Sequence, residues 1–233
     1  MNLRTTFHPF RRMAAILLCV MSAAVYAKAT NFPEPVPRAH ESVSQLSKDL
    51  NVGDVVFIHV SPLPFEKVSA ATQSWVNHVG IVVNASPTDP VIAESTFPFS
   101  RTTTLSRFTQ RSQDGRVAIA RLNPPLTEPQ RDGVRRAARH RLGIFYDTGF
   151  NLNSPRQFCS RFVREVLADA TGVTVGEVQT FRTLLQSNPD TDIGFWRLWY
   201  LGRIPWERTT VTPASLLHSD RMNIIFDGFS ESS

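Results

Sequence analysis

Apolar positions along the chain follow two periodicities, and together these predict an α+β fold. A spacing of three to four residues predicts helices over 42–50 and 128–141, and a third helix that begins at Ser154. Short runs of β-branched and aromatic residues predict strands instead. The predicted strands are 55–58, 75–83, 91–95, 117–122 and 222–226.

Turn-forming residues fill 84–90, so residues 79–95 are expected to form an antiparallel hairpin. Opposed residues of a hairpin have a constant index sum. A turn centred near Ser86 would therefore pair His78 with Glu94 on one face of the sheet. A register shift of one residue would place the two side chains on opposite faces.

The third helix carries a cysteine near its predicted start. Ser154-Pro155-Arg156-Gln157 has the form of a capping box, which places Cys159 about one turn inside the helix. The positive end of the helix dipole there favours a negative sulfur.

Residues 174–210 contain an aromatic segment, Phe195–Trp206, and the pattern does not predict the secondary structure of these residues. A short helix is expected over 212–217.

The N-terminus has the pattern of a secretory signal peptide over residues 1–27. Arginines precede the apolar run 13–25, and Val25-Tyr26-Ala27 suits cleavage after Ala27. The run is shorter than the roughly 20 residues that span a bilayer. Leu18 is too large for lipoprotein cleavage before Cys19. We therefore expect a periplasmic or secreted protein, with a proline-rich linker over 28–43 and one domain over 44–229.

Removal of the signal peptide also changes the charge of the chain. The formal net charge of +5 includes three arginines of the signal, so the mature part has 22 basic and 20 acidic residues. A charge of +2 gives little support for nucleic-acid binding. The sequence has no metal-ligand spacing and no glycine-rich phosphate loop, so no metal or other cofactor is expected.

Cys159 is the single cysteine that remains in the mature chain, and it is either an inert buried thiol or a nucleophile. A nucleophilic thiol needs an imidazole as base and a third group to orient that imidazole. The His78–Glu94 pair meets this need, although a histidine in a strand is often structural. His59 is the second candidate base, but no paired acid is evident. The weaker candidates are His40, His140 and His218.

Five blocks of the sequence, in this order, resemble the circularly permuted papain-like enzymes of the NlpC superfamily, and the YebB-like and YiiX-like branch looks closest. The order, with histidine before cysteine, is the most specific feature of the resemblance. The blocks are Gly53-Asp54-Val55-Val56-Phe57, Asn77-His78-Val79-Gly80-Ile81-Val82, Val91-Ile92-Ala93-Glu94-Ser95, Tyr146-Asp147 and Phe158-Cys159-Ser160-Arg161-Phe162-Val163.

The resemblance implies a bent antiparallel sheet packed against the helix that presents Cys159. It also implies that Cys159 is the nucleophile, His78 the general base, Glu94 the group that orients His78, and Tyr146 a donor to the oxyanion. Tyr146 could instead be a packed aromatic residue. Arg161 departs from the acidic residue that relatives often have at this position, so we expect a different charge beside the site.

Three functions remain open on the sequence alone. An exported cysteine amidase or peptidase would act through a thioester, with peptidoglycan fragments as abundant substrates. A lipid or N-acyl hydrolase, or an acyltransferase, would use Phe195–Trp206 to line an acyl pocket or to contact a membrane surface. A non-catalytic binding module would keep the fold without using Cys159.

Overall fold

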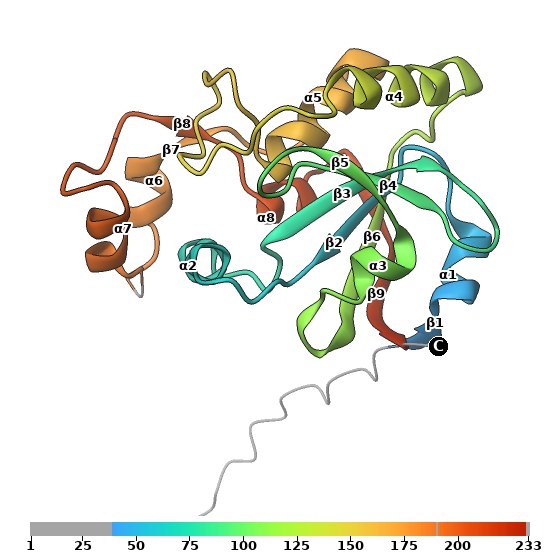
Figure 1. The fold of residues 1–233 in the computed structure, drawn as a ribbon, viewed down its shortest axis with the longest axis horizontal. Helices are drawn as coiled ribbons and strands as arrows, with labels where there is room; N and C mark the ends of the chain where they lie inside the picture. Colours follow the sequence, from blue (N-terminus) through green and yellow to red (C-terminus); the bar gives the residue numbers. More distant parts are fainter. Residues whose placement is uncertain (1–38, 190, 232–233) are drawn as a thin grey trace, which may run out of the picture. The chain divides into compact units, whose positions relative to one another are not determined.

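The computed structural model describes residues 39–189 and 191–231, and their fold is built on a seven-stranded sheet (Figure 1). The strand order is β1-β9-β6-β2-β3-β4-β5, and all neighbours are antiparallel except β1 and β9. The strands are β1 (Ala39–Ser42), β2 (Val55–Ile58), β3 (His78–Asn84), β4 (Val91–Glu94), β5 (Arg101–Thr104), β6 (Arg116–Leu122) and β9 (Met222–Glu231). A second, two-stranded sheet contains β7 (Gln179–Thr180) and β8 (Thr209–Thr210).

Both faces of the central strand β2 are buried, which explains its uninterrupted apolar run. Val55 and Phe57 belong to a core cluster with residues of α4 (Glu128–His140) and α5 (Cys159–Thr171). Val56 and Ile58 point the other way. Their cluster includes residues of α1 (Val43–Asp49) and α3 (Leu105–Thr109). The mixed fold predicted from the two periodicities is therefore confirmed.

Three of the predicted helices begin with a capping box. Ser42 and Thr127 form capping boxes at the starts of α1 and α4, and Pro129 lies in the first turn of α4. The short helix α8 (Pro213–Leu217) follows Thr212, which also forms a capping box. The signal peptide predicted over 1–27 lies outside the described residues.

One predicted boundary differs from the structure. Residues 39–42 fall in the predicted linker, but they form β1, which pairs in parallel with residues 228–231 of β9. This pairing also makes β9 longer than the strand predicted over 222–226. A four-residue strand with a partner distant in sequence leaves no periodicity of its own, and so the pattern did not reveal it.

A group of helices at one end of the sheet was not predicted. It contains α2 (Leu63–Thr72), α6 (Phe181–Gln186) and α7 (Ile193–Trp199), which Figure 1 shows beside one another. Lys67 of α2 forms an ion pair of 2.6 Å with Asp192, the N-cap of α7. Gln73 donates a hydrogen bond to Asn188 after α6. These contacts tie α2 to a segment more than a hundred residues away.

Among the helices of the described residues, none is both long enough and apolar enough to cross a membrane.

Candidate active site

Cys159 lies at the N-terminus of α5. It is the first helical residue, Phe158 is the N-cap, and the side chain of Phe158 makes no capping hydrogen bond. The sulfur is buried, with the residue 3% exposed. The first amides of a helix lack intrahelical partners and carry the positive end of the dipole. The first position of the helix therefore favours a thiolate more than the predicted position, one turn inside the helix, would.

The capping box predicted at Ser154 does not form. Ser154 instead accepts a hydrogen bond from the amide of Arg156 in a local turn, and the helix starts five residues later. Gln157 is drawn out of a helical conformation because it pairs with Tyr146 in an isolated parallel bridge. That bridge holds Tyr146 beside the residues that precede Cys159.

His78 and Glu94 meet as predicted, but through a different register. The observed pairs Ile81–Ala93 and Val82–Ile92 give an index sum of 174, two more than the predicted 172, and the pairing shifts again at Asn84. A shift of two residues keeps both side chains on one face and makes them diagonal neighbours. Nε2 of His78 lies 2.6 Å from Oε2 of Glu94.

Two arginines that the sequence did not single out complete the surroundings of Glu94. Nη2 of Arg111 lies 2.7 Å from Oε2 of Glu94, and Nε of Arg101 lies 3.4 Å from Oε1. Arg111 also lies over the ring of Phe108, which stacks on His78 with 5.6 Å between centroids. Glu94 is fully buried, and a buried carboxylate requires such partners.

These contacts shift both titrating groups toward their charged forms. Burial lowers the pKa of His78, but interactions with Cys159 and the hydrogen bond and charge of Glu94 outweigh it and raise the pKa to about 9. Burial raises the pKa of Glu94, but His78 and Arg111 lower it to about 2. At neutral pH His78 is therefore an imidazolium beside a carboxylate.

The other ring nitrogen of His78, Nδ1, is buried and makes no hydrogen bond within the described part of the chain. Because Nε2 is occupied by Glu94, Nδ1 is the nitrogen left to exchange a proton with Cys159, whose sulfur already acts on the pKa of the ring. Glu94 thus fixes the orientation of the His78 ring.

Tyr146 lies close to the same sulfur. Its hydroxyl is buried, without a hydrogen-bond partner in the described part of the chain. Burial raises the pKa of Tyr146 well above its usual value, and the charge of Cys159 raises it further. The hydroxyl therefore keeps its proton and can donate a hydrogen bond. Its ring also packs edge-on against Phe65 and Phe150.

Cys159 opens onto a narrow, largely apolar pocket. Its cavity volume is about 20 Å³, which is about the room that a single water needs. Phe65 of α2 forms one wall, Leu184 of α6 and Trp196 of α7 form another, and Val211 after β8 lies beside Ser160. Phe150, also in the lining, has a backbone φ of 49°, a left-handed conformation that is strained for a bulky residue.

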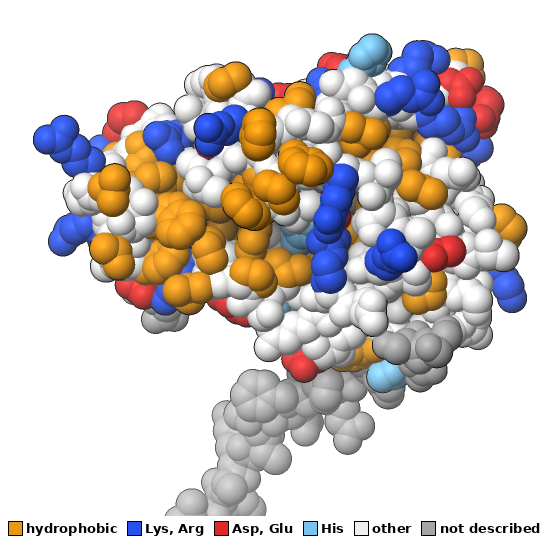
Figure 2. All heavy atoms as spheres, viewed as in Figure 1, with side chains coloured by type: hydrophobic (Ala, Val, Ile, Leu, Met, Phe, Trp, Pro, Cys, Tyr) orange, Lys and Arg blue, Asp and Glu red, His pale blue; other side chains and the backbone are white. Residues whose placement is uncertain are grey.

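The aromatic segment Phe195–Trp206 divides between the core and the surface. Trp196 is buried in the pocket wall, whereas Leu198 and Leu201 are 78% and 92% exposed. Figure 2 shows hydrophobic side chains gathered over α7, α2 and the loops beside them, with Lys and Arg side chains next to this area.

The sequence predicts that Arg161 changes the charge beside the sulfur, but its guanidinium does not lie there. Its guanidinium turns away to the preceding loop, where Nη1 donates to the carbonyls of Ser154 at 2.6 Å and Arg156 at 2.8 Å. Nε pairs with Glu165 at 2.7 Å. Arg161 thus holds the loop that leads into Cys159, because those carbonyls would otherwise lack partners.

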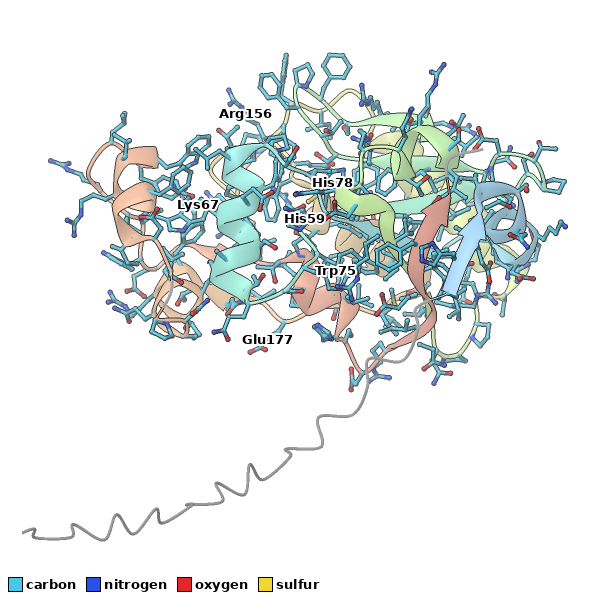
Figure 3. All side chains as sticks on the ribbon, turned by 90° about the horizontal axis from the view of Figure 1, so that it is seen from below. His59, Lys67, Trp75, His78, Arg156 and Glu177 are labelled. Carbon is cyan, nitrogen blue, oxygen red and sulfur yellow. The ribbon has the colours of Figure 1, made fainter. Side chains whose placement is uncertain are left out.

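His59, the second candidate base, does have a paired acid, contrary to the sequence-based expectation. Nε2 of His59 lies 3.0 Å from Glu66 of α2, and Nδ1 lies 2.5 Å from the carbonyl oxygen of Trp75. His59 directly follows β2 and His78 begins β3, so the two histidines lie near the adjoining ends of these paired strands (Figure 3). Both nitrogens of His59 are occupied, which leaves none for a thiol.

Comparisons with known proteins agree with this fold. The chain is 25% identical over 184 residues to the uncharacterized protein YiiX of Escherichia coli K12, which covers 79% of this chain and 90% of the relative. A crystal structure of YiiX from Escherichia coli O157:H7 matches with a TM-score of 0.71 and 24% identity. That match covers 77% of this chain and 98% of the other, and it supports the fold.

The YiiX protein of that crystal structure is described as a metalloprotein. In residues 39–189 and 191–231 of the present chain, no group of three or more His, Cys, Asp and Glu side chains could hold a metal ion. The described side chains around Cys159 therefore do not fit a resident metal.

A family model described as permuted papain-like amidase enzyme, YaeF/YiiX, C92 family, matches residues 49–226. This range contains the cysteine, the histidine, the glutamate and the tyrosine described above, as well as the strands and helices that position them. The chain therefore belongs to the C92 family of permuted papain-like amidases and is a papain-like cysteine hydrolase.

Proposed function

We propose that this hydrolase cleaves an amide bond through a thioester on Cys159, with His78 as base and then acid. The observation that carries the proposal is the arrangement at His78, where Glu94 occupies Nε2 and leaves the buried Nδ1 for the sulfur. This is the arrangement of a nucleophile, a base and an orienting acid. The order of these residues in the chain also supports a place in the wider NlpC superfamily, near its YebB-like members.

The steps follow from the charges. The thiolate attacks the carbonyl carbon and forms an S–C bond, while the carbonyl oxygen becomes an oxyanion that Tyr146 stabilises. The C–N bond then breaks, its electron pair stays on nitrogen, and His78 gives its proton to that nitrogen. Water, deprotonated by His78, attacks the thioester carbon, and the sulfur leaves with its electron pair. No cofactor enters these steps.

We further propose that the protein is exported to the periplasm or secreted after cleavage behind Ala27. The support is the sequence pattern of residues 1–27. Sequencing the N-terminus of the protein recovered from a periplasmic fraction tests this. Lys28 at the N-terminus is the expected result, and a chain that keeps Met1 in the cytoplasm would contradict it.

Peptides of the cell wall are the first candidate substrates, because an exported amidase meets them in that compartment. A second candidate is a lipid or N-acyl amide, and the apolar pocket at Cys159 and the exposed Leu198 and Leu201 favour it. These leucines lie in the segment proposed to contact a membrane surface. Nucleic acid is not proposed as a partner.

One experiment separates the two substrate classes. Wild type and Cys159→Ala are incubated with muropeptides and, separately, with phospholipid vesicles, and products are identified by mass spectrometry. Cys159-dependent product from muropeptides alone supports the peptide candidate and rejects the lipid candidate. Cys159-dependent product from vesicles alone supports the lipid candidate and rejects the peptide candidate. Absence of any Cys159-dependent product from both would count against the amidase mechanism for these two classes.

A further inference from the structure

Most of the large apolar side chains that are exposed in the described residues lie in two groups, and we call these together the apolar face. One group lies in the loops at residues 97–99 and 145, and the other lies on α7 and just after it. Exposed apolar side chains that gather in this way mark a surface that contacts a partner. The members of the apolar face are Phe97, Phe99, Phe145, Leu198, Trp199 and Leu201.

The phenylalanine group is held against the loop that carries Tyr146. Phe99 and Phe145 face each other in an isolated antiparallel bridge. The amide of Tyr146 donates a hydrogen bond of 2.9 Å to the carbonyl of Pro98. Tyr146 in turn pairs with Gln157, two residues before the cysteine of the site. This part of the apolar face therefore lies next to the residues that lead into the nucleophile.

The α7 group is tied to the same loop from its other end. Nε1 of Trp199 donates to the carbonyl of Thr148 at 3.0 Å, and the hydroxyl of Tyr200 donates to the carbonyl of Gly149 at 3.1 Å. Figure 2 shows hydrophobic side chains from α7 across the loops beside it, with Lys and Arg side chains next to them. Both groups thus meet at the loop that follows Tyr146.

The charged side chains of this region have one sign. In the three segments that carry the apolar face, residues 96–101, 144–156 and 193–206, the single acidic residue is Asp147. It is buried, and its carboxylate accepts the amides of Gly149 and Asn151. The exposed charges of these segments are all arginines, namely Arg101, Arg156, Arg197 and Arg203.

This combination of apolar and positive side chains selects among possible partners. In a two-fold dimer formed through the same face, the arginines of one copy would lie against those of the other, and like charges repel. An anionic membrane surface suits both kinds of side chain. Aromatic and aliphatic side chains enter the boundary between headgroups and acyl chains, while arginines bind the phosphates.

We propose that the apolar face docks onto the surface of an anionic phospholipid membrane and holds the site against amides carried there. The proposal adds the phenylalanine loops and the arginines to the membrane contact proposed for Phe195–Trp206. It rests on the proposed function for the reaction alone, because docking itself does not require Cys159 to react.

Partition onto phospholipid vesicles, measured by co-sedimentation of the full chain, tests the apolar contacts. Cys159→Ala is the parent, so no turnover alters the lipid. Phe145→Ser and Leu201→Asn should each lower the partition constant about tenfold. Asn is chosen at position 201 because it tolerates the φ of 50° there. Ile224→Ser, at an exposed position of β9, is the matched control and should bind as the parent does.

All variants carry the same N-terminus, so its contribution cancels in the ratios of their partition constants. Equal partition of the parent, both face variants and the control would overturn the proposal. Size-exclusion chromatography is run without lipid on the same proteins. A dimer of the parent that Phe145→Ser converts to a monomer would also overturn it, since the face would then be an interface between copies.

A second pair of variants tests the preference for anionic lipid. Replacing Arg156 and Arg203 together by Gln should lower partition at least about tenfold on vesicles that mix phosphatidylcholine with phosphatidylglycerol, because each arginine contributes about fivefold. Partition on phosphatidylcholine alone should not change. The control replaces Arg136 and Arg139, two exposed arginines of α4, by Gln. Equal losses in the two double variants would show attraction without a docking face and would overturn the proposal.

Failure of the reaction can be told apart from failure of docking. With Cys159 intact, Leu201→Asn should hydrolyse the soluble ester p-nitrophenyl acetate at the wild-type rate, because Leu201 does not line the site. Reduced partition with an unchanged ester rate is the result expected. A wild-type ester rate no faster than that of Cys159→Ala would contradict the proposed function, and the vesicle measurements would still decide on docking.

Discussion

Two histidine–glutamate pairs lie near the adjoining ends of β2 and β3, and they differ in which hydrogen-bonding atoms remain without a partner. His59 contacts Glu66 through one nitrogen and the carbonyl of Trp75 through the other. His78 contacts Glu94 through one nitrogen, and its second nitrogen has no partner among the described residues. The first pair is complete as a structural link between β2, α2 and the following loop.

Burial separates the two pairs as well. The side chains of His59 and Glu66 are 19% and 36% exposed, whereas those of His78 and Glu94 are 2% and 0% exposed. Charges interact more strongly when water is excluded. A histidine–glutamate contact alone therefore does not mark an active site. We propose His78 as the base because, in addition, its second nitrogen is open, water is excluded and the sulfur of Cys159 is near.

Replacing each histidine gives the largest contrast. His78→Ala removes the base and the proton donor, so we expect Cys159-dependent hydrolysis to fall by about 10³-fold. His59→Ala should change the rate by less than about threefold, since His59 has no nitrogen available for the reaction. Steady-state kinetics of both variants checks this. A similar loss in both would mean that the comparison between the pairs is wrong.

The hydroxyls of Tyr146 and Tyr200 differ in the same way: one has no hydrogen-bond partner in the described structure, and the other has one. Tyr146→Phe removes a hydroxyl without a partner in the described structure, and we expect kcat to fall by about 10²-fold with little change in stability. Tyr200→Phe removes a hydrogen bond to the carbonyl of Gly149, so it should lower stability by about 1 kcal/mol and spare kcat. Kinetics and urea unfolding separate the two effects. Unchanged kcat in Tyr146→Phe would return Tyr146 to the role of a packed aromatic residue.

The two carboxylates should differ in stability. Glu94→Gln leaves Arg111 and His78 without their buried partner, and we expect the free energy of unfolding to fall by about 3 kcal/mol. Glu66→Gln breaks a half-exposed contact and should cost about 0–1 kcal/mol. Urea denaturation of both variants is the measurement. Equal losses would show that burial of Glu94 does not strengthen its contacts.

The dependence of rate and stability on pH tests the protonation state of His78, and the expected effect is the smallest of those predicted. The pKa of His78 is raised to about 9, so hydrolysis of an amide should decline as pH rises through 9, because the proton for the leaving nitrogen is lost. The stability that this raised pKa contributes is complete below pH 6.5, the ordinary value, and is lost as pH rises through 9. NMR titration of His78 checks the value directly. In Cys159→Ala the pKa should fall, since contact with Cys159 raises it.

Much of the site could be predicted because its signals are local in the sequence. His78 and Glu94 interrupt apolar strands of one hairpin. Side chains alternate between the two faces of a strand, so a register that differs by two residues from the predicted one still places both on the same face. The predicted helix start failed because a tertiary contact, the bridge from Gln157 to Tyr146, overrides a good capping sequence. The positions of Cys159 and Tyr146 both depend on that bridge.

The remaining parts depend on contacts between distant segments. Arg101 reaches Glu94 because β5 pairs with β4, and the Arg101-Thr102-Thr103-Thr104 run has the β-branched character that could have indicated this strand. Arg111 gives no such signal, because it follows the short helix α3 and comes to Glu94 through tertiary packing. The pocket also needs α2 and α6–α7 together, and their ion pair joins Lys67 to Asp192.

The rate of alkylation of Cys159 by iodoacetamide at pH 6 tests the central claim most directly. Peptide mass spectrometry of the full-length chain follows Cys159 alone. If His78 holds the proton of the thiol, wild type and His59→Ala should react at the same rate, at least about tenfold faster than a free cysteine, whose thiol has a pKa near 8.5. His78→Ala should react no faster than the free thiol. Equal rates in wild type and His78→Ala would contradict the account.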